Sequence, residues 1–132
     1  MVSLLIISHQ YVGKALVKTT QSIFGKLPLP TAVVEVPHDA NIETTLLKIK
    51  ALIKKIDHGQ GILVLTDMFG STPSNIAQNL TINHHLHIIS GVNLPMLTRI
   101  MNYPHLPLSK LTQKAISGGK AGVLNCKQRL NS

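Results

Sequence analysis

The sequence predicts an α/β fold with an open, mainly parallel, doubly wound sheet and helices on both of its faces. Two observations lead to this class. Apolar runs such as "VSLLIIS" and "ILVLT" are short and continuous, as in strands that are buried on both faces of a parallel sheet. Between these runs apolar residues recur at helical spacing, and strands that alternate with helices indicate a parallel sheet.

Size and composition fit this class. The chain has 132 residues, which suits a single domain over residues 1–132, and 44% of them are hydrophobic, which favours a packed core. No apolar run approaches the roughly 20 residues that cross a bilayer, and the N-terminus lacks the pattern of a signal peptide. The single cysteine, Cys126, cannot form an internal disulfide. These features favour a reduced, cytoplasmic protein.

The first half of the chain predicts two strand–helix pairs. Residues 2–8 are expected to form a strand, followed by a helix over 11–24 that stops at Gly25. A second strand is expected over 31–36, and Asn41 is the expected N-cap of a long helix. The apolar stripes are Val12, Ala15, Leu16, Thr19 and Ile23 in the first helix, and Ile42, Leu46, Ile49, Ile53 and Ile56 in the second.

The middle of the chain predicts two further strands, over residues 62–66 and 86–90. A helix is expected to begin near Pro73, because proline is tolerated in the first turn of a helix. Residues 91–103 are expected to form a glycine-led loop and a short helix. Right-handed crossovers then place the C-terminal ends of all the strands at one edge of the sheet.

The C-terminal part predicts one more helix, from Ser109 to Ser117. Gly118 and Gly119 are expected to end it, because glycine is the most frequent residue just after a helix. Residues 122–130, "GVLNCKQRL", are predicted to form either a strand or a frayed tail.

Two polar residues follow predicted buried strands. His9 comes after the first strand and Asp67 after the third, so both are expected at the edge where open α/β sheets bind their ligands. A carboxylate that accepts a hydrogen bond from one ring nitrogen fixes the histidine tautomer and leaves the other nitrogen free as a nucleophile. His9 and Asp67 are therefore the predicted catalytic pair.

The turn "FGSTPSN" after Asp67 has the features of an anion site. Gly70 lets the backbone come close to a ligand, and the amides of Ser71 and Thr72 are expected to point freely from a helix start, where the dipole favours anions. The two hydroxyls are additional donors. Each feature alone has a commoner structural use, as a satisfied polar residue, a cap or an ordinary turn. Together they describe an acceptor for a phosphoryl group.

The chain resembles the IIA component of the mannose family in the bacterial phosphoenolpyruvate-dependent sugar phosphotransferase system (PTS). The resemblance runs over nearly the whole chain, from "LLIISHQ" through "LVLTDMFGSTPSNIA" and "ISGVNLPML" to the tail. In the middle motif an aspartate precedes an aromatic residue, Gly, a small residue, Ser or Thr, and Pro. That motif is specific to the family, and "GVNLPM" follows it in register.

The resemblance implies a phosphotransferase component with a phosphohistidine intermediate. His9 would take a phosphoryl group from the histidine-containing carrier protein HPr and pass it to a IIB partner. Asp67 would hold the His9 ring, the backbone of Ser71 and Thr72 would bind the phosphate, and "GVNLPM" would form a neighbouring loop. No metal or organic cofactor is implied, because the protein itself carries the phosphate.

The resemblance also implies partners. Family members are typically homodimers in which the last strand joins the partner's sheet, and residues 122–130 are the expected antiparallel edge strand. A separate IIB acceptor is expected, because the chain ends soon after the IIA unit. Peripheral association with IIC and IID membrane components is compatible with this role, and so is phosphorylation that reports sugar or nitrogen status without transport.

Two features depart from the family pattern. Many members have a second glycine where this chain has Ser71, a change that keeps the backbone amide. Thirteen basic residues against five acidic ones give a net charge of +8, which is unexpected for docking a carrier that often presents basic residues itself. Such a charge is also found in nucleic-acid-binding modules, but only four aromatic residues are available for base stacking.

Two other classes of site have weaker support in the sequence. In a receiver domain Asp67 itself would take the phosphate, but such a site needs Mg²⁺ held by further carboxylates, and the first strand ends in Ser-His-Gln. The run "NHHLH" over residues 83–87 contains candidate zinc ligands, but no cysteine or carboxylate stands near it to complete a tetrahedron. The sequence favours the phosphohistidine site over both.

Overall fold

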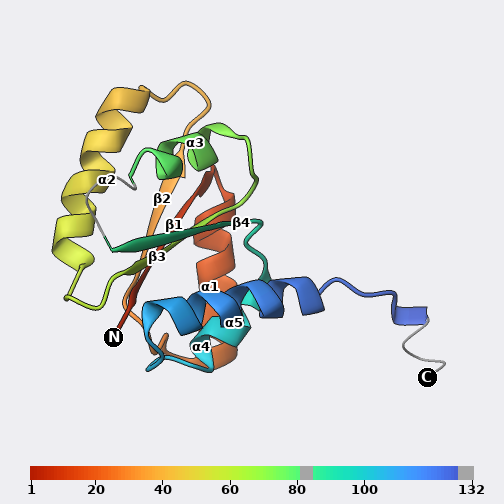
Figure 1. Cartoon of the computed structure of the whole chain (residues 1–132). Coiled ribbons are helices and arrows are strands. Elements are labelled where there is room, and N and C mark those ends of the chain that lie inside the picture. The colour runs from red at the N-terminus through yellow and green to blue at the C-terminus, as the bar shows by residue number, and fades with distance from the viewer. Residues whose placement is uncertain (81–84, 128–132) are drawn as a thin grey trace.

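A computed structural model describes residues 1–80 and 85–127, and it has the predicted α/β architecture (Figure 1). Four parallel strands form one sheet in the order β2-β1-β3-β4. The strands are β1 (Ser3–His9), β2 (Thr31–Val36), β3 (Ile62–Thr66) and β4 (Leu86–Ser90). The helices are α1 (Val12–Phe24), α2 (Ile42–Ile56), α3 (Thr72–Gln78), α4 (Leu94–Met101) and α5 (Leu108–Ala121).

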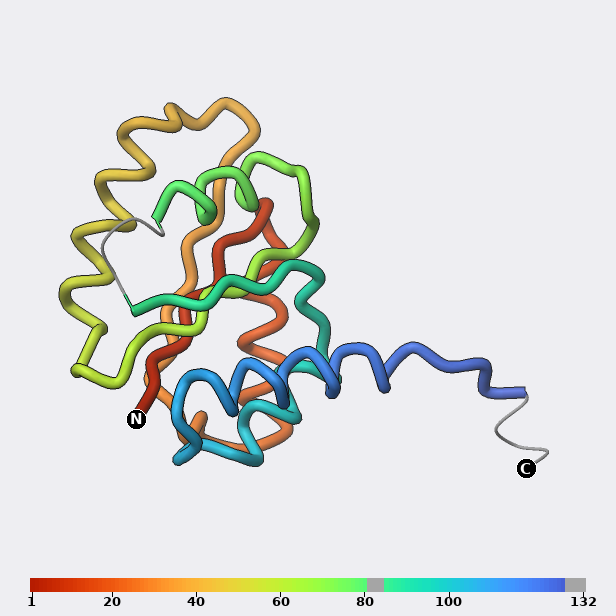
Figure 2. The backbone as a smooth tube through the Cα atoms, in the orientation of Figure 1, coloured from red at the N-terminus to blue at the C-terminus, as the bar shows by residue number. Residues whose placement is uncertain are grey.

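Helices cover both faces of the sheet, as the predicted doubly wound class requires (Figure 2). On one face Leu4 and Ile6 of β1 belong to a core cluster with α1, α4 and α5. On the other face Leu5 and Ile7 pack with α2 and α3. All four of these side chains are fully buried. This two-sided burial explains why the strands are continuous apolar runs.

The strand order reverses between β1 and β3. From β1 the chain moves outward to β2, and it then returns to the other side of β1 to form β3 and β4. A crevice therefore opens at the C-terminal ends of β1 and β3, which is the usual ligand position in this class of sheet. The parallel register sets Ile7 opposite Thr66, so the ends of the two strands are level.

The predicted stripe of α1 is wrong except at Leu16. The side that faces the sheet carries Gly13 and Thr20, with Leu16 and Val17 packed against the core, whereas Ile23 is 59% exposed. Gly13 causes this rotation, because a Cβ there would lie 2.7 Å from Ser8 Oγ and 2.8 Å from Val33 Cγ1. Only a residue without a side chain lets the first turn of α1 approach the sheet so closely.

The long helix α2 largely follows its predicted stripe. Asn41 caps it as expected, with its side chain accepting a hydrogen bond from the amide of Thr44 at 2.9 Å. Ile49 and Ile53 are completely buried, while Ile42 at the start of the helix is 53% exposed. The buried stripe therefore begins one turn later than the sequence pattern predicts.

The predicted end of the last helix is also wrong. Gly118 and Gly119 lie inside α5, which continues to Ala121. They are buried against α4, and a Cβ on Gly118 would lie 2.5 Å from Cβ of Arg99. These glycines permit a close helix–helix approach instead of ending the helix.

The chain after α5 extends away from the body of the protein (Figure 1). Residues 122–127 contain no strand, and Val123 and Leu124 are 79% and 51% exposed. The remainder of the predicted exchange segment, residues 128–130, lies outside the described residues, so the exchanged edge strand stays a prediction. None of the helices in the described part of the chain combines the length and hydropathy needed to cross a bilayer.

Candidate active site

His9 and Asp67 meet across the crevice between β1 and β3, as predicted. One carboxylate oxygen, Oδ2 of Asp67, lies 2.8 Å from the ring Nδ1 of His9 and accepts the backbone N–H of His9 at 3.0 Å. The side chain of His9 is 44% exposed, and that of Asp67 is only 12% exposed. The carboxylate is therefore inside the protein, and the ring reaches toward solvent.

This contact fixes the chemistry of the His9 ring. An ionised carboxylate can only accept hydrogen bonds, so the proton between the two groups belongs to Nδ1 of His9. In the neutral ring the lone pair is then on Nε2. The other oxygen, Oδ1 of Asp67, is buried without a hydrogen-bond partner among the described residues. Both hydrogen bonds that Asp67 makes at the site thus go to His9.

Two residues that the sequence did not single out hold the backbone beside His9. The hydroxyl of Ser8 accepts the amide of Gly13 and donates to the carbonyl of His9, both at 2.8 Å. Glu35 lies opposite Ser8 on β2, and its nearly buried carboxylate accepts the amide of Lys14 at 3.1 Å. These contacts satisfy the first amides of α1, whose N-cap Tyr11 makes no side-chain cap. Polar residues within a buried strand were the signal for them.

The turn after Asp67 differs in detail from the predicted cradle. Gly70 has a φ of +81°, and a Cβ on it would meet no protein atom within 4 Å. Its role in the fold is therefore the left-handed backbone conformation. The hydroxyl of Ser71 donates to the carbonyl of Met68 at 2.6 Å, and its amide points to the same oxygen at 3.4 Å. The Ser71 groups are thus partly used within the turn, contrary to expectation.

Thr72 is better placed to bind an anion. It is the first residue of α3, and within the described part of the chain its amide makes no hydrogen bond to the preceding turn. The first amides of a helix are not used within the helix and carry part of its positive dipole. The start of α3 therefore offers hydrogen-bond donors a few residues after Asp67, which itself follows β3.

The "GVNLPM" loop lies at the same edge of the sheet, as predicted. The amides of Gly91 and Val92 both donate to the carbonyl of Thr66, at 2.9 and 3.0 Å. Asn93 caps α4 by accepting the amide of Met96 at 2.8 Å. The loop is thus hydrogen-bonded to Thr66, the residue that immediately precedes Asp67.

The structure does not favour either of the alternative sites, a phosphorylated Asp67 or a metal site in the histidine run. The more buried side chain of Asp67, bonded to His9, is less accessible than the His9 ring, which disfavours Asp67 as the phosphate acceptor. The rings of His85 and His87 meet edge to face, with centroids 6.5 Å apart. In residues 1–80 and 85–127 no group of three histidine, cysteine or acidic side chains is arranged to hold a metal ion. His84, within the same run, lies outside the described residues.

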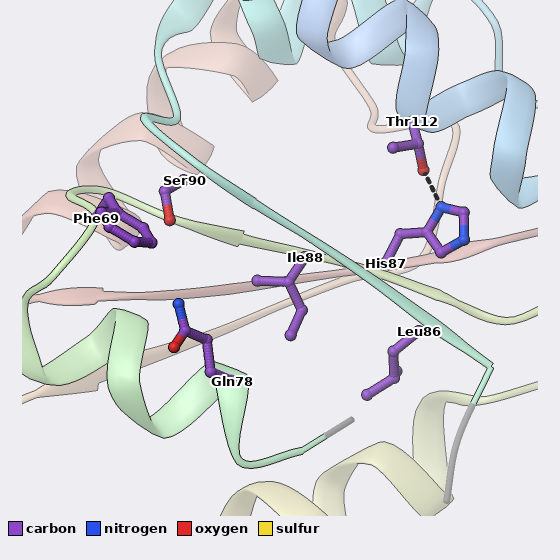
Figure 3. A pocket seen from close by; sticks show the side chains of 7 residues that line it. All are labelled: Phe69, Gln78, Leu86, His87, Ile88, Ser90 and Thr112. Atoms are coloured by element: carbon purple, nitrogen blue, oxygen red, sulfur yellow. Dashed lines mark hydrogen bonds between the residues drawn. The ribbon is translucent and has the colours of Figure 1, made fainter. Parts of the chain in front are cut away.

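A hollow of about 550 Å³ lies along β4, the edge strand next to the site (Figure 3). Its lining includes His87 and Ile88 of β4, Thr112 of α5 and Phe69 from the turn after Asp67. Thr112 donates its hydroxyl proton to the carbonyl of Leu108 at 2.8 Å, so it accepts the 2.8 Å bond from Nδ1 of His87. The hollow thus extends from the edge strand β4 to the turn that follows Asp67.

Comparison with known proteins identifies the class of this fold and site. The EIIA-man family model, described as "PTS system fructose IIA component", matches residues 3–110. The structure superposes on the mannose/sorbose-specific IIA subunit from Enterococcus faecalis with a TM-score of 0.85 and 26% identity, covering 94% of this chain and 93% of that chain. The EIIA component from Streptococcus agalactiae, at 21% identity, shares the fold with a TM-score of 0.82, over 97% and 99% of the two chains.

The sequence relatives agree. The chain is 30% identical over 125 residues to the mannose-specific EIIAB component of Escherichia coli strain K12, covering 92% of this chain. It spans only 38% of that longer relative. It is 28% identical to the fructose-specific EIIA component of Bacillus subtilis strain 168, over 98% of this chain and 90% of that protein. The chain therefore belongs to the EIIA-man family of PTS IIA components, which confirms the resemblance.

Proposed function

We propose that this chain is a phosphocarrier in which His9 accepts a phosphoryl group from phospho-HPr and passes it to a IIB partner. The observation that carries this proposal is the 2.8 Å contact between Nδ1 of His9 and Oδ2 of Asp67. It leaves Nε2 as the unprotonated nitrogen of a ring that is 44% exposed. Membership of a family of PTS IIA components supports the same role.

The transfer step follows from this geometry. The lone pair on Nε2 of His9 attacks phosphorus while the bond from phosphorus to the carrier's imidazole breaks, and the leaving nitrogen keeps the bonding electron pair. The His9 ring then carries a positive charge, which the Asp67 carboxylate stabilises through the Nδ1–H bond. Transfer to IIB is the same step in reverse. Positioning and charge stabilisation are sufficient, and no metal or organic cofactor takes part.

We assign the phosphate cradle mainly to the start of α3. The amide of Thr72, which makes no hydrogen bond to the preceding turn in the described residues, stands at the start of α3, where the helix dipole favours an anion. Gly70 and Ser71 shape the turn that presents Thr72. The amide of Ser71 contributes only if its long bond to Met68 is exchanged for one to phosphate.

Exposed apolar side chains beside the site suit a protein partner. Tyr11 follows β1 and is 76% exposed, while Met68 and Phe69 after β3 are 59% and 74% exposed. Large apolar residues gathered on a surface mark an interaction site. HPr and IIB are the proposed partners that dock on them in turn.

We also propose that the chain is a homodimer joined along β4. This strand is at the edge of the sheet, and unpaired edges recruit further strands. The hollow beside it contains Leu86 and Ile88, and the exposed pair Val123 and Leu124 leads into the segment expected to be exchanged. Because Phe69 lines the same hollow, a partner strand there would lie close to the active site.

The decisive experiment is labelling from radioactive phosphoenolpyruvate in the presence of enzyme I and HPr. The wild-type protein is expected to acquire one acid-labile, base-stable phosphate, and His9→Gln is expected to acquire none. His58→Gln is the matched control, because His58 is exposed and lies at the opposite edge of the sheet, after α2. Full labelling of His9→Gln would refute the assignment.

A further inference from the structure

The charges of this protein are separated along the direction of its strands. All five acidic residues lie within residues 1–67, and four of them are near the C-terminal edge of the sheet. Glu35 is the second-last residue of β2, and Asp67 follows β3. Asp39 is in the loop after β2, and Glu43 is in the first turn of α2. The active-site edge is therefore its most acidic part, despite the net charge of +8.

The opposite edge of the sheet carries a group of basic residues. Helices α1, α2 and α4 begin at the active-site edge and end at the opposite edge, where α5 begins. Figure 1 shows the end of α2, the start of α5 and the N-terminus together at its lower left. We call the cations near these helix ends the basic edge. Its members are Lys26, Lys54, Lys55, Arg99 and Lys110, and Lys114 follows one turn further along α5. The acidic residue at the same edge is Asp57.

The cations of the basic edge form no ion pairs with acidic side chains in the described residues. The ion pairs found in residues 1–80 and 85–127 are His9–Asp67 and Lys14–Glu35, both at the other edge. Lys114 lies over the ring of Tyr103, with Nζ 4.5 Å from the centroid. No acidic residue occurs anywhere after Asp67.

Helix electrostatics explain only part of the basic edge. Lys54, Lys55 and Arg99 are in the last turns of α2 and α4, where the helix dipole favours cations. Lys110 is the third residue of α5, where the dipole disfavours a cation, and no acidic residue is present in that turn. Lys110 therefore lacks the helix-dipole stabilisation that Lys54, Lys55 and Arg99 have.

The surface around Lys110 and Lys114 is hollowed. Together with Leu106, Gln113 and Ser117 these lysines line a depression of about 410 Å³ on α5. Arg99 reaches the same place, with Nη1 3.5 Å from the hydroxyl of Ser117. Ammonium groups without an acidic partner, hydroxyl and amide donors and one apolar side chain make up this surface, which suits phosphate groups.

We propose that the basic edge docks on an anionic lipid bilayer. Most of the cations are lysines, and the nearby aromatic ring of Tyr103 is already covered by Lys114. The forked arginine contacts and free stacking rings that nucleic-acid recognition uses are thus largely missing from this edge in the described residues. A bilayer presents a flat field of negative charge, and each lysine near it adds attraction without needing precise geometry.

Docking in this way would orient the molecule. The basic edge and His9 lie at opposite ends of the parallel strands, so a protein bound through the basic edge presents its active site to the aqueous side. The acidic and apolar surface around His9 then stays open to a partner. The proposal goes beyond the phosphocarrier role and does not depend on it.

The test is binding to vesicles without any phosphoryl donor. The basic-edge variant combines Lys26→Gln, Lys54→Gln, Lys55→Gln and Lys110→Gln. The control variant combines Lys18→Gln, Lys48→Gln, Lys120→Gln and Lys127→Gln, all exposed and away from that edge. Both variants have the same net charge. Co-sedimentation is measured with vesicles of phosphatidylglycerol and phosphatidylcholine and with phosphatidylcholine alone, after circular dichroism has shown that each variant is folded.

The wild-type protein is expected to bind the anionic vesicles and not the neutral ones, with binding lost at high salt. The basic-edge variant should lose about tenfold or more in partition coefficient, and the control variant less than about threefold. Equal losses in the two variants, or no wild-type binding to the anionic vesicles, would overturn the proposal. So would a selective loss of binding to an RNA oligonucleotide or to polyglutamate with vesicle binding unchanged.

A second measurement tests the orientation. A fluorophore is attached through His58→Cys, at the basic edge, or through His38→Cys, after β2 at the active-site edge, each in a Cys126→Ser background. A quencher carried on the lipid headgroups is expected to reduce fluorescence at position 58 and to leave position 38 unchanged. The reverse pattern, or equal quenching at both positions, would contradict the orientation.

Discussion

A single oxygen atom, Oδ2 of Asp67, sets both the position and the protonation of the His9 ring. It accepts the backbone amide and the Nδ1–H group of the same residue, so the ring cannot turn without losing a hydrogen bond to a nearly buried carboxylate. Ser8 holds the carbonyl of His9 from the other side. The His9 ring is thus held in place by Ser8 of β1 and by Asp67, which follows β3.

Asp67→Asn is expected to slow phosphoryl transfer by about 100-fold with the fold retained. Asparagine preserves the size of the side chain, and its amide oxygen can still accept the Nδ1–H bond, but it removes the negative charge that would stabilise the phosphorylated ring. The measurement is the initial rate of transfer from phospho-HPr. Asp57→Asn, at the opposite edge, is the control and should match the wild type. A rate for Asp67→Asn within threefold of the wild type would show that the carboxylate is not needed.

Ser71→Ala is expected to leave the transfer rate within about threefold of the wild type. The Ser71 hydroxyl is bonded to the carbonyl of Met68, and a single hydrogen bond of this kind contributes about 1 kcal/mol. The backbone amide is unchanged by the substitution. The same transfer assay checks this, and a loss above tenfold would mean that the hydroxyl itself contacts the phosphoryl group.

Packing between elements, more than local sequence, decides where α5 ends. A Cβ on Gly118 would lie 2.5 Å from Cβ of Arg99 and 3.3 Å from the carbonyl of Pro95, atoms that cannot move without moving α4. A Cβ on Gly119 would instead lie 2.8 Å from the terminal methyl of Met96, which is flexible.

Gly118→Ala is therefore expected to lower the free energy of unfolding by about 1–3 kcal/mol, although alanine is the better helix former. Gly119→Ala should cost clearly less, because the Met96 side chain can shift. Urea unfolding followed by circular dichroism measures both, with Ser117→Ala on the exposed side of α5 as the control. Equal costs for the two glycines would contradict the close approach at Gly118.

The proposed dimer is expected to become a monomer when the chain is cut after Gly122. The proposed partner segment begins at Val123, and the truncated chain is expected to keep its fold because Val123 and Leu124 are 79% and 51% exposed. Light scattering coupled to gel filtration should give the mass of a dimer for the full chain and of a monomer for the truncated one. A full-length monomer would refute the dimer, and a truncated dimer would place its interface elsewhere.

The sequence was sufficient for features that follow from general rules of the fold. The four strands and the meeting of His9 with Asp67 came from apolar runs and from the rule that parallel strands end at one edge. The rotation of α1, set by Gly13 against Ser8, could not be predicted, because it depends on contacts between elements. The hydrogen bond from the amide of Lys14, in the first turn of α1, to the carboxylate of Glu35 could not be predicted either, because the two residues are 21 positions apart in the sequence.

The central claim, that Asp67 reserves Nε2 of His9 for the phosphoryl group, is tested most directly by nuclear magnetic resonance. The protein is labelled with ¹⁵N at histidine and phosphorylated through HPr, and the ³¹P–¹⁵N coupling identifies the bonded nitrogen. We expect one phosphohistidine, at Nε2 of His9, with the proton retained on Nδ1. A phosphate on Nδ1 of His9, or on any other residue, would contradict it.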